Sequence, residues 1–157
     1  MQEHELEAFF HDGYARVLGV VTLVTGSHAV AEDAVHEALA RAWGHRRPID
    51  HPDRWVLTVS LNLARNRWRK VRREVPIPPD AASGAGPADA RPLSVDLRRA
   101  LAALPRRQRE VVVLHYLLDL PVAEVAAVLG LSVGGVKHAL FRARASLASA
   151  LTTEEIS

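Results

Sequence analysis

A tight turn between two predicted helices, within residues 121–151, constrains the fold of this chain more than any other stretch. Pro121 suits the first turn of a helix, where its missing N–H is not needed, and Gly130 can adopt the left-handed conformation that ends one. Ser132 follows as a suitable N-cap for a second helix. Two helices joined so closely form a helix-turn-helix, whose second helix enters the major groove when the motif binds DNA.

Both predicted helices have apolar residues at helical spacing. In the first helix these residues are Val122, Val125, Ala126 and Leu129, and in the second they are Val133, Val136, Leu140, Ala143, Leu147 and Leu151. The other side of the second helix is left with Lys137, His138, Phe141 and Arg142. An ordinary helical hairpin with a solvated basic face would have the same pattern, so the remainder of the chain decides between the two interpretations.

Two further helices are predicted just before this motif. Ser94 is a suitable cap for a helix that contains Leu97, Ala100, Leu101 and Leu104. Pro105 opens the next helix, in which Val111, Leu114 and Leu118 are expected to face inward. Together with the helix-turn-helix, these segments predict a C-terminal domain of four helices over residues 94–151, followed by a tail at residues 152–157.

The N-terminal part begins with an amphipathic helix near residues 3–24. The triplet Thr25-Gly26-Ser27 interrupts this pattern, and Ser27 can cap a second helix near residues 29–44. The apolar stripe of that second helix consists of Ala31, Ala34, Val35, Ala38, Leu39, Ala42 and Trp43. Its exposed face carries charged residues four apart, namely Asp33, Glu37 and Arg41. This face is either simply solvated or a docking surface for a basic partner.

A third helix, near residues 52–73, changes character along its length. Its first half, from Trp55 to Leu61, is apolar nearly all round and is expected to be buried. Six of the eleven residues from 63 to 73 are basic. Cationic side chains neutralise phosphates, and an aromatic ring can stack on an unpaired base. We therefore interpret this end of the helix, with Asn62, Asn66 and Trp68, as a nucleic-acid contact.

Charge is segregated along the chain, although the net charge is only +2. The net charge is −5 over residues 1–44, +7 over residues 45–73, −3 over residues 74–97 and +5 over residues 98–150. Two basic blocks separated by an acidic one predict two surfaces that bind a polyanion.

Five of the nine prolines fall between Glu74 and Pro92. This composition predicts a flexible linker over residues 74–93. The expected fold is therefore all-α, with a three-helix domain over residues 1–73 and the four-helix domain over residues 94–151.

Composition excludes several classes of protein. The 157 residues suffice for one ordinary domain or two small ones, and the absence of cysteine excludes disulfides and thiolate metal sites. The sequence shows neither a signal peptide nor an apolar stretch of the roughly 20 residues that span a membrane. We expect a cytoplasmic protein without membrane insertion.

Eight histidines raise the alternative of a metal-dependent hydrolase. They are scattered, and the pair His36-Glu37 lacks the second histidine that a zinc-protease helix carries three residues further on. Neither a glycine-rich phosphate loop nor a nucleophile motif is present. We therefore expect no enzymatic activity, no catalytic residue, no metal and no cofactor.

Three segments, in order, resemble the extracytoplasmic-function (group IV) sigma factors, which are promoter-recognition subunits of bacterial RNA polymerase. Residues 31–43 (AEDAVHEALARAW) are similar to region 2.2 of that family, and residues 59–66 (VSLNLARN) to regions 2.3 and 2.4. Residues 104–114 (LPRRQREVVVL) and 132–137 (SVGGVK) are similar to region 4. The SigE-type actinobacterial branch is the most similar. The resemblance implies a factor that binds core polymerase and directs promoter-specific initiation.

The resemblance also implies a role for each surface. Asp33, Glu37 and Arg41 would dock on the clamp helices of the largest polymerase subunit, and the C-terminal domain on the flap of the second largest. The −10 element would be read by Arg46, Arg47, Asn62, Arg65, Asn66, Trp68 and Arg69. The −35 element would be contacted by His115, Ser132, Gly134, Lys137, His138, Phe141 and Arg142. Many relatives have an anti-sigma partner, which the resemblance allows here too.

The chain departs from the family pattern at a few positions. His36 stands where Gln is usual, Gly135 where Thr is common, and His138-Ala139 replaces Ser-Arg or Ser-Gln. Two glycines at the start of the recognition helix each cost up to about 1 kcal/mol of helix stability, which favours close approach of the backbone to DNA over rigidity. The rival interpretation is a two-domain helix-turn-helix regulator that does not bind polymerase, but it leaves the acidic face and the basic helix end unexplained.

Overall fold

The computed structural model describes the backbone of residues 1–74 and 94–156, with side chains described for residues 1–67 and 94–150. The chain divides into two compact units, Met1–Arg91 and Pro92–Ser157. All regular secondary structure in the described part is helical. The prediction of an all-α chain with two helical bodies is confirmed. The predicted linker lies, apart from Glu74, outside the described residues.

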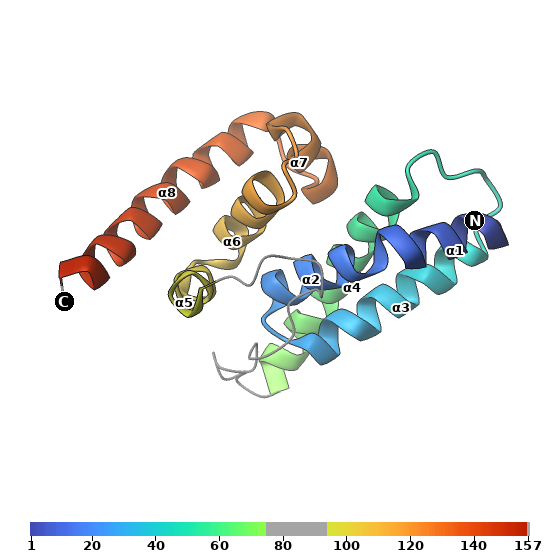
Figure 1. Ribbon diagram of the computed structural model, residues 1–157, viewed down its shortest axis with the longest axis horizontal. Coiled ribbons are helices and arrows are strands. Elements are labelled where there is room, and N and C mark those ends of the chain that lie inside the picture. The colour runs from blue at the N-terminus through green and yellow to red at the C-terminus, as the bar shows by residue number, and fades with distance from the viewer. Residues whose placement is uncertain (75–93, 157) are drawn as a thin grey trace. The chain divides into compact units, whose positions relative to one another are not determined.

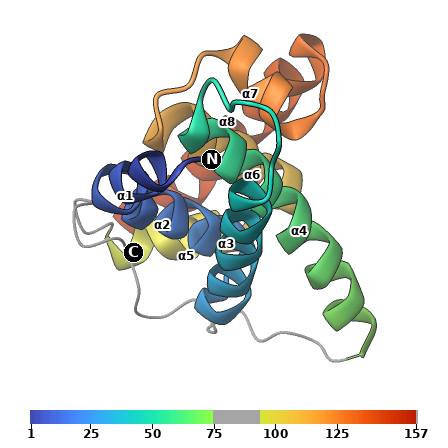
Figure 2. The same ribbon diagram turned by 90° about the vertical axis from the view of Figure 1, so that its right-hand side faces the viewer.

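The N-terminal unit consists of α1 (Glu3–Asp12), α2 (Tyr14–Thr25), α3 (His28–Trp43) and α4 (Pro52–Glu74) in its described part. Helices α2, α3 and α4 pack against one another, and α1 contacts α2 and α4 (Figure 1). The C-terminal end of α4 extends beyond the helices packed against it (Figure 2). The end of the basic half of α4 therefore projects from the bundle, while Ala64 at its start is buried.

The prediction of a single helix near residues 3–24 is wrong, because Gly13 separates two helices, α1 and α2. A Cβ atom at this glycine would lie only 2.7 Å from Oδ1 of Asp53, in the first turn of α4. Helical periodicity alone could not reveal the break, since the apolar spacing continues across it. Because glycine has no side chain, the backbone at Gly13 can lie close to Asp53 of α4.

The cap predicted between α2 and α3 is confirmed. Gly26 adopts a left-handed φ of 77° and ends α2. The side-chain oxygen of Ser27 then accepts a hydrogen bond of 3.2 Å from the backbone N–H of Val30. The turn thus satisfies backbone groups that a helix end would otherwise leave without partners.

The core of the N-terminal unit is built largely from the predicted apolar stripes. Ala34, Val35, Ala38 and Ala42 of α3 are fully buried, as are Val56 and Ala64 of α4. Trp43 was expected in this core but is 55% exposed. Successive residues of a helix point about 100° apart, so a buried Ala42 turns Trp43 away from the core.

The C-terminal unit consists of α5 (Val95–Ala103), α6 (Arg106–Val112), η2 (Val113–Leu117), α7 (Val122–Leu129) and α8 (Val133–Ile156) in its described part. Helix α6 runs directly into η2, a short turn of π-helix. Helix α8 packs along α6 and also contacts α5 and α7 (Figure 1). The predicted inward residues Val111 and Leu114 are fully buried, whereas Leu118 is only half-buried.

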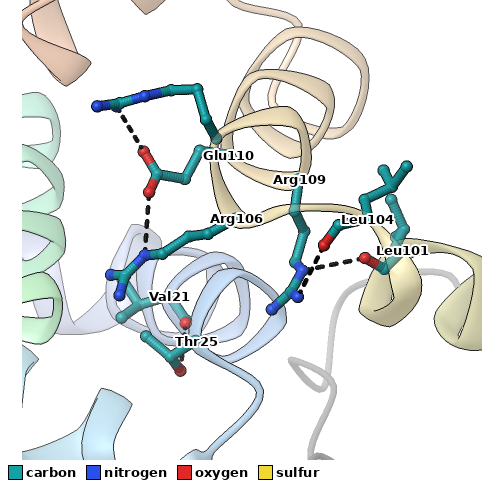
Figure 3. Close-up of polar contacts among 8 residues, drawn as sticks. Val21, Thr25, Leu101, Leu104, Arg106, Arg109 and Glu110 are labelled. Atoms are coloured by element: carbon teal, nitrogen blue, oxygen red, sulfur yellow. Dashed lines mark hydrogen bonds and ion pairs between the residues drawn. The ribbon is translucent and has the colours of Figure 1, made fainter. Parts of the chain in front are cut away.

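A buried carboxylate and a capping guanidinium fix α6 in this unit. Glu110 is 2% exposed, and its two oxygens accept hydrogen bonds from Arg106 at 3.1 Å and Arg107 at 3.2 Å. Arg109 donates hydrogen bonds to the carbonyl oxygens of Leu101 and Leu104 at the C-terminus of α5 (Figure 3). Burial lowers the pKa of Arg109, and nearby Glu110 partly opposes this shift.

Candidate functional site

The helix-turn-helix geometry follows the predicted caps. Helices α7 and α8 meet at 104°, within the range of about 90–120° that the motif shows. Gly130 ends α7 with a left-handed φ of 67°. The side-chain oxygen of Ser132 then accepts a 2.9 Å hydrogen bond from the backbone N–H of Gly135 and so caps the first turn of α8. The predicted turn and N-cap are confirmed.

One side of α8 is buried and the opposite side is available to a ligand. Val136, Leu140 and Ala143 are buried against the unit, while the predicted contact residues Gly134, Lys137, His138, Phe141 and Arg142 are all exposed. Phe141 is 71% exposed, which is unusual for a side chain of this size. Val133, in the first turn of α8, was predicted to face the core but is 43% exposed.

The two glycines of the recognition helix differ in their surroundings. A Cβ atom at Gly134 would have no neighbouring atom within 4 Å, so the space in front of it is open. A Cβ atom at Gly135 would lie 3.1 Å from the side-chain oxygen of Ser132. Gly135 therefore makes room for the N-cap, whereas Gly134 leaves an open approach to the helix backbone.

His115 and Tyr116, at the end of η2, are each held by a polar contact. Nδ1 of His115 lies 2.8 Å from the carbonyl oxygen of Leu120, so this nitrogen carries the hydrogen that it donates. Arg144 of α8 donates a hydrogen bond to the hydroxyl of Tyr116, and its guanidinium carbon lies 5.6 Å from the centre of that ring. Arg144 was not among the predicted contact residues, although it lies seven residues after Lys137 and so on the same side of α8.

The predicted −10 residues are spread over α4 and the loop that precedes it. Asn62 and Asn66 are exposed and Arg65 is half-buried, and helical periodicity places all three on one side of α4. The side chains of Trp68 and Arg69 lie outside the described residues.

The loop between α3 and α4 exposes Arg46 and Arg47. The buried side chain of Ile49 anchors this loop to the unit. Nδ1 of His45 also lies 2.9 Å from the carbonyl oxygen of Arg47, and its ring meets that of Trp55 edge to face. The two cationic side chains are therefore presented from a supported loop.

The predicted docking face on α3 is exposed, but its carboxylates are paired. Oε1 of Glu37 lies 3.3 Å from Nε of Arg41, on the same helix. Oδ2 of Asp33 lies 3.2 Å from Nη1 of Arg67, on the neighbouring helix α4. The structure thus brings the three predicted residues together and adds Arg67, which the sequence analysis did not single out.

An aromatic cluster borders this face. The ring of His36 stacks on that of Tyr14 with centroids 6.0 Å apart, and the Tyr14 ring lies 5.1 Å from that of Phe10. Burial raises the pKa of Tyr14, and the negative charge of Glu32 raises it further. Phe10 and Trp43 are the large apolar side chains most exposed in the described part of this unit. Aromatic residues are enriched at protein interfaces, whose rims are polar.

The described residues provide neither a metal site nor a membrane-spanning helix. No group of three or more of their His, Asp or Glu side chains is placed to hold a metal ion. No single described helix has the length and apolar character to cross a membrane, and the pair α7 and α8 meets those criteria only when joined across its bend.

Comparison with known families matches each unit separately. Residues 9–74 match the family described as Sigma-70 region 2. Residues 94–147 match the family described as Sigma-70, region 4.

Individual proteins show the same similarity. The chain is 32% identical over 166 residues to the ECF RNA polymerase sigma factor SigL of Mycobacterium tuberculosis, covering 98% of this chain and 92% of SigL. It is 33% identical over 150 residues to a probable RNA polymerase sigma factor, RfaY, of Xanthomonas campestris, covering 86% of this chain but only 37% of RfaY. The structure resembles the sigma factor RpoE of Bartonella quintana, solved in complex with the anti-sigma factor NepR. That comparison has a TM-score of 0.73 and 26% identity, and covers 87% of this chain and 90% of RpoE.

Proposed function

Because this chain belongs to the extracytoplasmic-function sigma factors of the sigma-70 family, we propose that its two units divide promoter recognition between them. As an alternative sigma factor it directs transcription initiation. The N-terminal unit would dock on core polymerase and bind the −10 element, and the C-terminal unit would bind the −35 element. The observation that carries this division is that each unit exposes predicted contact residues of its own. They are Arg46, Arg47, Asn62 and Asn66 in the N-terminal unit, and Lys137, His138, Phe141 and Arg142 in the C-terminal unit.

The exposed side of α8 supports major-groove binding by the C-terminal unit. Lys137 and Arg142 supply cations for phosphates or guanine, while Phe141 offers an apolar surface. His138 can donate or accept a hydrogen bond, and Gly134 leaves the helix backbone open to approach. This mixture suits base recognition, for which phosphate attraction alone would not be enough.

The end of α4 supports contact with single-stranded DNA at −10. Asn62 and Asn66 have the donors and acceptors needed to read base edges, and Arg65 lies on the same side of the helix. The exposed Arg46 and Arg47 of the preceding loop would reach the same strand. Unpaired bases can enter such a surface, whereas bases inside a duplex must first be unstacked at a cost of a few kcal/mol.

The α3 face, with Asp33, Glu37 and Arg41, is the proposed docking surface for the clamp helices of the largest polymerase subunit. The C-terminal unit would contact the flap of the second largest subunit. The structural relative from Bartonella quintana binds an anti-sigma factor, and an anti-sigma partner is proposed for this chain by analogy. A regulator that does not bind polymerase is not favoured, because the region 2 similarity covers the N-terminal unit.

The test is a charge reversal on the docking surface. The variant Asp33→Arg should lose binding to purified core polymerase in a pull-down, yet bind −35 duplex DNA at least as tightly as the wild-type chain. Equal loss of both activities would mean that Asp33 only maintains the fold. Retained binding to core polymerase would remove this face from the proposed interface.

A further inference from the structure

The ion pair between Asp33 and Arg67 joins two surfaces to which the proposed function assigns different partners. Asp33 lies on the docking face of α3, and Arg67 lies in the basic half of α4. Their side chains are 70% and 41% exposed, with 3.2 Å between Oδ2 and Nη1. Both charges are therefore within reach of a partner in solution.

Arg67 differs from its neighbours in the side of α4 that it occupies. It follows Asn66 directly and so lies about 100° around the helix from it, on the flank that faces α3. A base contact needs a side chain aimed at the base edges, whereas a phosphate contact needs only a cation within reach. An arginine on this flank, with its long flexible stem, suits the phosphate backbone of a strand that runs along α4.

We propose that Arg67 is a further nucleic-acid contact of this chain, and that Asp33 holds its guanidinium back until either partner binds. This inference rests on the proposed function. A basic group that docks on Asp33 takes over its carboxylate and leaves Arg67 free for a phosphate. Because linkage is reciprocal, a phosphate bound to Arg67 makes Asp33 equally more available for docking.

The neighbouring pair, Glu37 and Arg41, cannot have this effect, because both residues lie on α3 within one surface. The pair that crosses from α3 to α4 is the one that links docking with nucleic-acid binding. An exposed ion pair is weak, so the linkage is expected to change affinity by up to about fivefold at low salt. Higher salt should reduce it by screening.

The experiment measures binding of the full chain, without polymerase, to fluorescein-labelled oligo(dT) at about 50 mM salt and above, by fluorescence anisotropy. Oligo(dT) is suitable because a phosphate contact is independent of sequence. Asp33→Asn should bind up to about fivefold more tightly than the wild type. Arg67→Gln should bind more weakly, with a smaller salt dependence, and the double variant should match Arg67→Gln.

Glu32→Gln is the matched control, because it removes one negative charge from the adjacent position of α3, where Glu32 pairs with His28.

An equal gain from Asp33→Asn and Glu32→Gln would overturn the inference, since it would reflect general electrostatics alone. So would a gain from Asp33→Asn that persists in the Arg67→Gln background, or an absence of oligo(dT) binding by the wild type. Circular dichroism on each variant checks that the fold is intact. A wild-type chain that shows the expected pattern but fails to bind core polymerase would contradict the proposed function and leave Arg67 as a nucleic-acid contact.

Discussion

The hydroxyl oxygen of Tyr14 lies 2.9 Å from Nε2 of His36, and the two rings are nearly parallel, with an interplanar angle of 9°. The contact joins α2 to the exposed side of α3, next to the proposed docking residues. Related factors usually carry Gln at position 36, which could make the hydrogen bond but not the ring stack. The histidine therefore ties the docking face more closely to α2.

Stability should fall at alkaline pH because of Tyr14. Burial and Glu32 raise the pKa of Tyr14 above the ordinary value of 10.0. Above pH 10 the unfolded chain releases the phenolic proton before the folded chain does, so the free energy of unfolding decreases as the pH rises. Phenolate absorbance should report this titration in a Tyr116→Phe variant, which leaves Tyr14 as the only tyrosine. Titration of Tyr14 at or below pH 10 would contradict the account.

Removal of Glu110 should destabilise the C-terminal unit. The substitution Glu110→Ala would leave the largely buried Arg106 without the carboxylate that it contacts at 3.1 Å, at an expected cost of about 3 kcal/mol in the free energy of unfolding. The matched control is Arg107→Ala, which removes the more exposed partner and should cost less than about 1 kcal/mol. Urea unfolding followed by circular dichroism measures both. Similar costs for the two variants would show that the burial of Glu110 adds nothing to its contribution to stability.

Gly134→Ala should have opposite effects on stability and on DNA binding. The site is open, so alanine should stabilise α8 by about 0.5–1 kcal/mol. The added methyl group, however, would lie on the proposed DNA-facing side and should weaken −35 binding. A thermal melt and a −35 binding titration on the same variant separate the two effects. Higher stability with unchanged DNA affinity would show that this glycine does not face DNA.

Phe141 should recognise thymine methyl groups. Its exposed ring is an apolar surface of the kind that contacts the C5-methyl of thymine in the major groove. The probe is a duplex selected from a random library by the full chain, with single thymines replaced by deoxyuracil. Loss of one buried methyl should weaken binding about fourfold at the contacted position. Phe141→Ala should abolish this difference, and equal affinities for thymine and deoxyuracil at every position would exclude the contact.

Local signals predicted much of the C-terminal unit. Pro121, Gly130 and Ser132 act within one or two turns of the helices that they bound, so their roles could be inferred from sequence. The exposure of Lys137 and Phe141 followed from helical period alone. Val133 was misplaced, because helical period identifies a face of the helix but not which residues along that face are covered.

Features that depend on tertiary contact could not be predicted. Asp53, which is distant in sequence, lies too close to Gly13 for a side chain to fit there. The pairing of Asp33 with Arg67 likewise depends on how α3 packs on α4. The stack of His36 on Tyr14 crosses between helices in the same way. Each of these contacts joins residues that no short sequence pattern connects.

The central claim is that this chain binds core RNA polymerase and directs it to specific promoters. The most direct measurement is transcription with purified core polymerase on a genomic DNA library, followed by mapping of the 5′ ends of the transcripts. The account predicts initiation at a limited set of sites that share −35 and −10 elements, and loss of these transcripts with Asp33→Arg. A transcript pattern identical to that of core polymerase alone would contradict it.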